Sequence, residues 1–292
     1  MDNKIDTLTL PSPAKLNLFL HIIGRRKDGY HLLETLFQFI EFHDTLHFES
    51  NLKDNITVSP TIDDLPVEDN LVFKAASKLL PFRKNTRFGT HIHLDKNLPM
   101  GAGIGGGSSN AATTLLALNE LWECQLSLDE LADIGLSLGA DVPIFVHGKS
   151  AFAEGVGEKL TFVEPQTPTY LLIKPNVHVN TGQIFTDKRL TRDTLPIKIS
   201  HVLTLDGHND CLNVVRELYP DVNEAFLWLK NQGDVKLTGT GACLFLAFKQ
   251  KADAERVKQA VPKKWQSWIC NGSNTSLTHT ALDQWVEKNR KK

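Results

Sequence analysis

The sequence predicts an α+β protein with two domains. Its 292 residues are long for one hydrophobic core and comfortable for two. The first half begins with stretches in which apolar residues alternate, as in strands, and continues with helical patterns. The second half has the order strand, helix, strand, strand, helix, strand, which is the split β-α-β pattern of a ferredoxin-like domain. Pro165 and Pro168 bracket a polar junction, so we expect domains over residues 1–162 and 163–292.

Periodicity defines the elements of the first half. Residues 14–23 and 90–95 have apolar side chains at alternate positions, which predicts two strands. Residues 33–42 are rich in β-forming and aromatic residues, and residues 45–49 could pair with them. Residues 70–80 indicate a helix.

Two more helices are predicted after these elements. Residues 108–122 indicate a strongly amphipathic helix, with one apolar face formed by Ala111, Leu115, Leu118 and Trp122. The next helix begins at a capping box, Ser127 to Glu130, and ends near Gly139. Asp141 then lies in a loop or in the first turn of a new element.

The second half contains four predicted strands and two predicted helices. The strands are residues 169–174, 235–238, 244–248 and 266–269. The helices are residues 210–232, interrupted at Pro220, and residues 252–260.

Composition and charge give no support for a nucleic-acid or membrane surface. The chain is 41% hydrophobic and 23% charged, and its net charge of −2 argues against nucleic-acid and membrane surfaces. No apolar run approaches the ~18 residues of a membrane span, and residues 1–6 lack the apolar region of a signal peptide. The four cysteines have no metal-binding spacing. We expect a cytoplasmic protein with reduced thiols, either a monomer or a weak homodimer.

A glycine-rich segment, residues 99–110, precedes the helix at 108–122. Five of its twelve residues are glycine, against 19 in the whole chain. Backbone without Cβ atoms lets peptide N–H groups close around a bulky anion, and the dipole at a helix N-terminus favours a phosphate. The segment therefore predicts a cradle for nucleotide phosphates.

Other glycine-rich sites fit this segment less well. Gly101 to Gly106 satisfies G-x-G-x-x-G, but it does not follow a strand directly, and no acidic residue ends a second strand ~20 residues later. Gly148-Lys149-Ser150 lacks the leading glycine of a P-loop, and the protein-kinase motifs are missing. A flexible linker is the remaining alternative, although this segment leads directly into a helix.

The segment is one of three ordered motifs that resemble the GHMP kinases, a superfamily of small-molecule kinases. Residues 99–110 resemble its ATP-binding signature, Pro13-Ala14-Lys15-Leu16-Asn17 its N-terminal motif, and residues 237–243 its C-terminal glycine motif. The resemblance implies a two-domain GHMP kinase fold, with an N-terminal domain like the second domain of ribosomal protein S5 and a ferredoxin-like C-terminal domain. It also implies ATP as co-substrate, together with Mg²⁺.

Further segments narrow the resemblance. Residues 24–31 (GRRKDGYH), 139–143 (GADVP) and 153–158 (AEGVGE) are similar to GHMP kinases whose acceptor is a cytidine diphosphate-linked methylerythritol. This implies transfer of the ATP γ-phosphate to the 2-hydroxyl of that alcohol, a step in the non-mevalonate route to isoprenoid precursors.

Lys15 and Asp141 are the candidate catalytic residues. A lysine in an otherwise apolar strand needs an explanation, and Asp141 follows a helix end. Asp141 would act as the base, while Lys15 would hold it ionised and stabilise charge on the acceptor oxygen. The alternatives are a structural ion pair for Lys15 and a helix cap before Pro143 for Asp141.

The resemblance also assigns substrate-binding residues. It implies Tyr30 and Phe185 as the two walls of a cytosine site, because aromatic faces stack on bases, and His31 as a partner of the pyrimidine edge. Without the resemblance, Phe185 would be a core residue and His31 an ordinary loop histidine. Asn17 and Thr181 are expected at the erythritol and phosphate parts of the substrate, and Thr240 together with the amides of residues 239–242 is expected to close over a phosphate.

The expected ATP site consists of the glycine-rich segment and the residues just before it. Lys96 and Asn97 would contact adenine or ribose. The phosphates would be wrapped by Pro99, Met100, Gly101, Ala102, Gly103, Ile104, Gly105, Gly106, Gly107, Ser108 and Ser109. The Mg²⁺ ligands stay open, with Ser108 or Ser109 as candidates.

Three other functions remain as alternatives. One is a GHMP kinase that acts on homoserine or mevalonate; such a kinase binds no cytosine, so the segment Asp28-Gly29-Tyr30-His31 would have no base to contact. A GHMP-fold protein that binds its ligand without turnover would not need Lys15 and Asp141. An RNA-binding protein with an S5-like domain is disfavoured by the net charge of −2.

Overall fold

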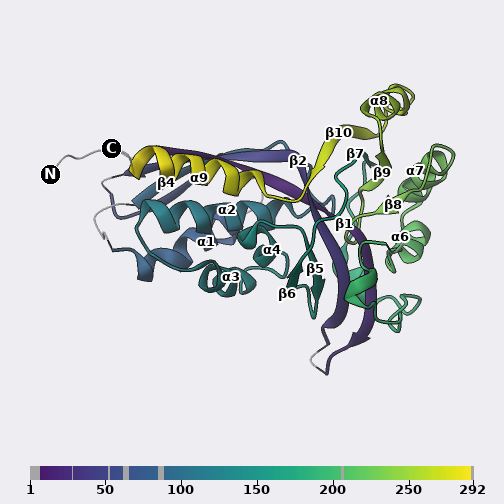
Figure 1. Ribbon diagram of the computed structural model, residues 1–292, viewed down its shortest axis with the longest axis horizontal. Helices are drawn as coiled ribbons and strands as arrows, with labels where there is room; N and C mark the ends of the chain where they lie inside the picture. Colours follow the sequence, from purple (N-terminus) through teal and green to yellow (C-terminus); the bar gives the residue numbers. More distant parts are fainter. Residues whose placement is uncertain are drawn as a thin grey trace.

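The computed structural model describes residues 7–27, 29–51, 53–61, 66–84, 89–204 and 207–290. Residues 1–6, where we expect no signal peptide, and Asp28 lie outside the described residues. Over the described ranges the chain is an α+β protein whose two halves lie side by side (Figure 1), which confirms the predicted fold class.

The strands form one connected hydrogen-bonded system. They are β1 (Thr7–Arg25), β2 (His31–Asn51), β3 (Ile56–Ser59), β4 (Gly89–Asp95), β5 (Ala151–Glu154), β6 (Lys159–Phe162), β7 (Thr169–Lys174), β8 (Lys236–Leu237), β9 (Leu244–Phe248) and β10 (Gln266–Ser273).

The helices lie between and after these strands. They are α1 (Leu71–Leu79), α2 (Gly106–Leu121), α3 (Leu128–Leu136), α4 (Val142–His147), α5 (Thr181–Thr186), α6 (Leu212–Leu218), α7 (Pro220–Lys230), α8 (Lys251–Gln259) and α9 (Leu277–Arg290). Short 3-10 turns occur at η1 (Val67–Asp69), η2 (Leu80–Phe82) and η3 (Ile199–His201).

β1 and β2 form a long antiparallel ribbon that reaches through both halves of the molecule (Figure 1). β2 is continuous, so the expected pairing of residues 33–42 with residues 45–49 is wrong. Both segments pair with β1 instead: Leu33 lies opposite Ile22, and Thr45 lies opposite Pro11. The ribbon is therefore the frame to which both halves attach.

In the first half the sheet has the order β3-β4-β2-β1, with β3 parallel to β4. One core joins this sheet to α1, α2 and α4. The capping box that begins α3 is confirmed: the Ser127 hydroxyl accepts from the Glu130 amide, and the Glu130 carboxylate accepts from the Ser127 amide.

α2 differs from the expected amphipathic helix. Residues 109–118 are all buried, polar residues included. The helix packs against the sheet, α1, α3 and α4, so the face expected to meet solvent meets other elements instead. Its polar side chains compensate by internal hydrogen bonds, such as that from the Thr114 hydroxyl to the Asn110 carbonyl at 2.8 Å.

In the second half the sheet has the order β10-β7-β9-β8, with every neighbouring pair antiparallel. In chain order these strands read 4-1-3-2, and α6, α7 and α8 pack on them around a separate core. The predicted ferredoxin-like element order is confirmed.

The end of the chain returns to the first half. β10 pairs with β2 at Gly272 and Ser273, beyond the expected strand end at residue 269. α9, which we did not expect from the sequence, lies along β1 (Figure 1). Trp285 Nε1 donates to the Thr7 carbonyl at 3.1 Å, and Leu282 is buried in the first core. The division of the chain after residue 162 stays a prediction.

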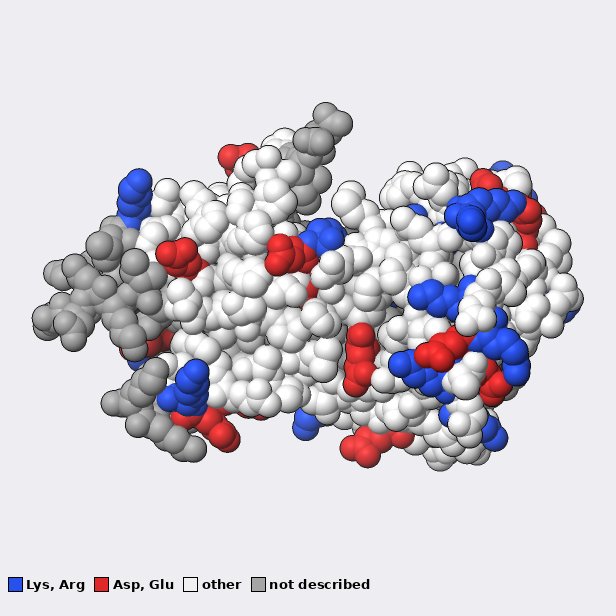
Figure 2. All heavy atoms as spheres, turned by 90° about the horizontal axis from the view of Figure 1, so that it is seen from above, with Lys and Arg blue, Asp and Glu red and all other residues white. Residues whose placement is uncertain are grey.

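The surface is mixed in charge. On the face in Figure 2, lysine and arginine side chains lie among aspartates and glutamates, mostly at the end that carries α7 and α8. Among the residues that the structure describes, none of the helices has both the length and the hydropathy that a membrane span requires.

Candidate active site

The glycine-rich loop connects β4 to α2, and its apolar residues anchor it. Ala102 and Ile104 are buried in a third core, which contains β1 residues such as Leu16 and β9 residues such as Phe245. Gly101, Gly103 and Gly105 alternate with them and have positive φ angles. The alternation buries two apolar side chains and leaves glycine backbone facing outward.

The loop makes direct contact with the second glycine motif. A Cβ atom on Gly103, where φ is +72°, would lie 2.4 Å from the carbonyl oxygen of Thr238. The Thr238 hydroxyl donates to the Gly103 carbonyl at 3.1 Å, and the Cys243 amide donates to the Ala102 carbonyl at 3.2 Å. Segments 135 residues apart in the chain are therefore packed backbone to backbone.

The N-terminus of α2 faces the loop with unpaired amides. The first helical hydrogen bond runs from the Ser109 amide to the carbonyl of Gly105, the residue that precedes the helix. The amides of Gly106, Gly107 and Ser108 therefore have no carbonyl partner within the helix. Such an end attracts phosphate through N–H donors and through the helix dipole.

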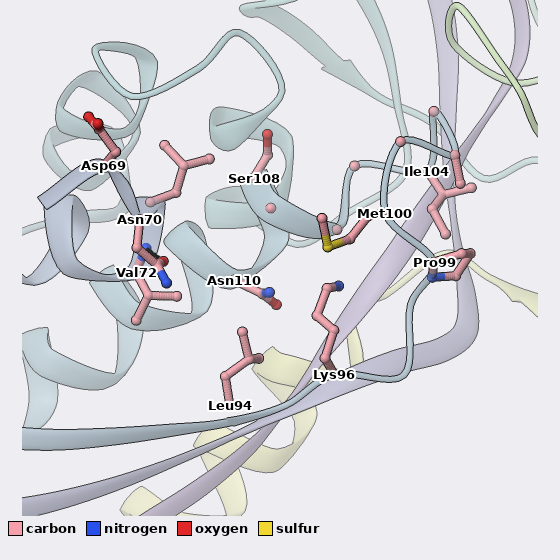
Figure 3. A pocket seen from close by; sticks show the side chains of 17 residues that line it. Asp69, Asn70, Val72, Leu94, Lys96, Pro99, Met100, Ile104, Ser108 and Asn110 are labelled. Atoms are coloured by element: carbon pink, nitrogen blue, oxygen red, sulfur yellow. Dashed lines mark hydrogen bonds between the residues drawn. The ribbon is translucent and has the colours of Figure 1, made fainter. Parts of the chain in front are cut away.

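A cavity of about 350 Å³ opens at this helix end. Among the expected ATP residues, Lys96 and residues 99–108 line it, whereas Asn97 and Ser109 do not. Figure 3 shows Lys96 extending into the cavity beside Asn110 and Met100. The opposite wall comes from η1 and α1, through Asp69 and Asn70.

Asp44 on β2 organises one side of this cavity. Its buried carboxylate accepts hydrogen bonds from Lys96 Nζ at 2.5 Å, Asn110 Nδ2 at 3.0 Å, and the amides of Asn97 and Leu98. These four donors compensate the loss of hydration of a buried charge. Asp44 thus fixes Lys96 at the cavity.

The two candidate loop serines point in different directions. Ser108 lines the cavity. The Ser109 hydroxyl is fully buried on the other side of the helix, where it donates to the Pro13 carbonyl at 2.6 Å and contacts the Ser12 hydroxyl at 2.8 Å. Ser109 therefore joins the loop to β1 and presents no hydroxyl to the cavity.

A second, larger cavity of about 680 Å³ lies on the other side of the loop. The expected catalytic and substrate residues all line it: Lys15, Asn17, Tyr30, His31, Asp141, Thr181, Phe185 and Thr240. Gly103, Gly105 and Ser108 line both cavities. The two cavities therefore meet at the N-terminus of α2.

Lys15 and Asp141 face each other beside this meeting point. Lys15 Nζ lies 3.3 Å from Asp141 Oδ2 and donates to Asn17 Oδ1 at 2.6 Å. The lysine side chain is 3% exposed and the aspartate side chain 36% exposed. The lysine is held inside the protein while the carboxylate remains open to a ligand.

Asp141 occupies the N-cap position of α4, but its side chain makes no capping hydrogen bond. The expected alternative role as a helix cap is therefore wrong. Because the carboxylate is turned toward Lys15, its geometry suits a group that contacts a ligand in the second cavity.

Asn17 links the N-terminal motif to the second glycine motif and to β2. Its Oδ1 accepts from Lys15 Nζ and from the Gly239 amide at 3.0 Å, and its Nδ2 donates to the Thr35 hydroxyl at 2.8 Å. Thr181 and Thr240 pair through their hydroxyls at 2.8 Å at the mouth of the same cavity. These side chains fix the distance between the second glycine motif and Lys15.

The aromatic residues lie at the other end of the cavity. His31 stacks on Phe185, with ring centroids 5.1 Å apart and an angle of 26° between the planes. Tyr30 is 64% exposed at the cavity rim. Burial, reinforced by the positive charges of Arg192 and Arg25, lowers the pKa of His31.

Sequence reasoning did not identify several residues of the two cavities. Asp44 did not stand out as Lys15 did, because its neighbours His43 and Thr45 are also polar. η1 and α1 also line the first cavity, and Val156 and Gly157, between β5 and β6, line the second. No local sequence pattern indicates these residues, because only the fold brings them to the cavities.

The fold and the site are those of a small-molecule kinase superfamily. A model of the GHMP kinases N terminal domain matches residues 70–149, and one of the GHMP kinases C terminal domain matches residues 197–267. The first match contains the glycine-rich loop and Asp141, and the second contains the second glycine motif.

Curated relatives define the family more narrowly. A 4-diphosphocytidyl-2-C-methyl-D-erythritol kinase of Marinomonas sp. (strain MWYL1) is 67% identical over 290 residues, covering 99% of this chain and 95% of the relative. The enzyme of that name from Mannheimia succiniciproducens is 50% identical, covering 97% and 94%. The chain belongs to the 4-diphosphocytidyl-2-C-methyl-D-erythritol kinase family within the GHMP kinases.

Solved structures agree with this assignment. A crystal structure of 4-(cytidine 5'-diphospho)-2C-methyl-D-erythritol kinase superposes with a TM-score of 0.80 at 28% identity, covering 91% of this chain and 99% of the other. A mevalonate kinase superposes with a TM-score of 0.66 at 15% identity, covering 91% and 99%, which shows the shared fold.

Proposed function

We propose that this chain transfers the γ-phosphate of ATP to the 2-hydroxyl of 4-diphosphocytidyl-2-C-methyl-D-erythritol, a step toward isoprenoid precursors. One observation carries the proposal: two cavities meet at the amide-rich N-terminus of α2, with the Lys15–Asp141 pair on one side of it. A phosphoryl donor in the first cavity and an acceptor alcohol in the second would then face each other.

In this mechanism Asp141 accepts or orients the proton of the acceptor hydroxyl. The hydroxyl oxygen bonds to the γ-phosphorus, the bond from that phosphorus to the β-γ bridging oxygen breaks, and ADP leaves with the electron pair. Lys15, fixed by Asn17, stabilises negative charge on the acceptor oxygen, which a tertiary alcohol needs because it is a weak acid.

The ATP site is proposed to use both ends of the first cavity. The amides of Gly106, Gly107 and Ser108 would bind phosphate oxygens. Lys96, held by Asp44, would contact the nucleotide across the cavity from Asn70 and Asp69. Thr240 on the second glycine motif would contact a phosphate through its own amide or hydroxyl, because the neighbouring amides of Gly239, Gly241 and Ala242 already donate to protein acceptors.

A magnesium ion fits this site as a partner of the phosphates. Among the described residues no group of three or more histidine, cysteine, aspartate or glutamate side chains is arranged for a metal. Mg²⁺ needs no such cage, since it keeps several waters and binds nucleotide phosphates. Ser108, which lines both cavities, could supply a hydroxyl oxygen. When bound, the ion would neutralise phosphate charge.

The acceptor is proposed to lie along the second cavity. Its cytosine would occupy the end formed by Tyr30, His31 and Phe185, and its erythritol the end formed by Lys15 and Asp141. His31 and Phe185 already stack on each other, so the base would lie against Tyr30 and meet His31 at its edge.

The molecular setting of this activity is also a proposal. We place an ATP-binding domain in residues 1–162 and a ferredoxin-like domain in residues 163–292, acting as a cytoplasmic monomer or weak homodimer.

Phosphorus NMR tests the proposal directly. The protein is incubated with ATP, Mg²⁺ and the cytidine diphosphate alcohol, and we expect a new phosphomonoester signal together with ADP. Parallel incubations contain homoserine or mevalonate as the acceptor. Turnover on either of these, without turnover on the cytidylyl alcohol, would assign the chain to another GHMP activity. Binding of all ligands without any turnover would indicate a ligand-binding protein.

A further inference from the structure

Arg192 lies behind the cytosine end of the second cavity and does not line it. Its guanidinium makes four hydrogen bonds. The NH2 group donates to the carbonyls of Phe185 at 3.0 Å and Asp187 at 2.7 Å, and NH1 donates to the carbonyl of Leu190 at 3.0 Å. The Nε hydrogen is directed at His31 Nε2 at 3.1 Å.

This contact determines where the imidazole carries its proton. A guanidinium has only donors and stays protonated at every accessible pH. His31 Nε2 must therefore be the nitrogen with the lone pair, and the single proton of the neutral ring resides on Nδ1. Nδ1 has no partner among the described residues and is not among their buried unpaired polar atoms, so it is open to a ligand.

We infer that Arg192 is a positioning residue that locks His31 in the Nδ1–H form, so that the cavity offers the pyrimidine a fixed hydrogen-bond donor and selects cytosine over uracil. The inference rests on the proposed function. Cytosine presents acceptors at O2 and N3 along this edge, whereas uracil carries a hydrogen on N3. A fixed donor matches the first arrangement and meets a second donor in the other.

The electrostatics of the site agree with a neutral ring. Burial is the main cause of the lowered pKa of His31, and the charges of Arg192 and Arg25 lower it further. Protonation would place a hydrogen on Nε2 and break the bond from Arg192. The ring therefore stays neutral at physiological pH, and the arginine decides only which nitrogen donates.

Nitrogen-15 NMR of histidine-labelled protein tests the lock without any substrate. The His31 signals are assigned by comparison with His31→Gln, and the spectra are recorded near pH 8. We expect the wild-type ring to be protonated at Nδ1. Arg192→Met should shift the proton to Nε2, the form that neutral imidazoles favour in water, whereas Arg192→Lys, which keeps a donor-only cation, should retain Nδ1–H. A wild-type ring protonated at Nε2 overturns the inference, even if the Arg192 variants fail to fold.

Calorimetric titration with CDP and UDP tests the selectivity. We expect the wild type to prefer CDP, Arg192→Met to lose about tenfold of that preference, and Arg192→Lys to keep most of it. Arg189→Met is the matched control, because Arg189 pairs with Asp187 and Glu217 and does not contact His31. An unchanged preference in Arg192→Met overturns the selectivity. Equal wild-type affinities for CDP and UDP would instead contradict the cytidine substrate of the proposed function, while the NMR experiment still decides the lock.

Discussion

At the scale of single residues, the proposed chemistry of the second cavity depends on the buried Lys15 and the partly exposed Asp141. We predict that Asp141→Asn and Lys15→Ala each lower kcat at least ~100-fold, because one removes the proton acceptor and the other removes charge stabilisation next to the acceptor oxygen. Steady-state kinetics with the cytidylyl alcohol measure both effects. Asp129→Asn is the control, since Asp129 is a 93% exposed carboxylate outside both cavities. A variant with near-normal kcat would remove that residue from the mechanism.

Tyr30 provides a second test at the same scale. Because its ring is exposed at the cavity rim, Tyr30→Ala should raise the KM for the cytidylyl substrate about tenfold, the usual effect of losing one stacked base, and leave the KM for ATP unchanged. Phe162→Ala, at an exposed aromatic residue outside both cavities, serves as control. Equal changes in both KM values would place Tyr30 outside the base site.

The sequence alone identified Lys15 and Asp141 as candidate site residues, but it did not identify Asp44 and Arg192, which hold other site residues in place. Lys15 stood out because a lysine in an apolar strand is costly unless it is paired. Asp44 and Arg192 act through other residues, and their partners Lys96 and His31 lie 52 and 161 residues away in the chain, where no local pattern connects them. His31 stacking on Phe185 likewise depended on how α5 docks against the ribbon.

At the scale of elements, short-range patterns predicted the strands that lie in one sheet and the helix with a capping box. These patterns did not predict the burial of a helix that is covered by other elements on all of its faces. α2 was expected to expose one face, yet its alanines and threonines pack against neighbours all round, because a helix between a sheet and other helices has no solvent side. α9 escaped prediction because only its contacts with β1, far away in the chain, give it a buried face.

The contact between the two glycine motifs gives an element-scale prediction. Gly103→Ala should reduce turnover at least ~10-fold and destabilise the fold by about 1–2 kcal/mol, since the new Cβ would clash with the Thr238 carbonyl at a positive φ. Turnover and urea unfolding measure the two effects. Gly24→Ala is the matched control: its Cβ would meet only Leu32 Cδ1 at 3.6 Å. Equal behaviour of the two variants would mean that the loops separate easily.

At the scale of the whole molecule, buried histidines make stability depend on pH. Burial is the largest cause of a lowered pKa for His21, His31, His147 and His279. The unfolded chain, with histidines near the ordinary value of about 6.5, then binds more protons than the folded chain as the pH falls. The free energy of unfolding should therefore be highest above about pH 7.5 and decrease as the pH falls through 6.5 toward 5.5.

Urea unfolding at several pH values measures this dependence. His279→Gln should make the slope with pH shallower, because glutamine can still donate to the Val146 carbonyl, which His279 Nε2 contacts at 2.8 Å, but does not titrate. His201→Gln, at an exposed histidine, is the control substitution. A flat profile in the wild type between pH 7.5 and 5.5 would contradict the prediction.

The ribbon of β1 and β2 has a further consequence for the molecule. It carries Lys15 in its middle and holds His31 opposite Arg25 at its far end. The ribbon therefore sets the distance between the proposed cytosine site and the proposed site of phosphoryl transfer. Each residue of the strand adds about 3.4 Å to that distance. Register shifts between Asn17 and Leu20, and between Ile22 and Gly24, lie within this span. Deleting one residue there would turn every later side chain to the opposite face of the ribbon. The strand register therefore determines the length of substrate that can reach both proposed sites.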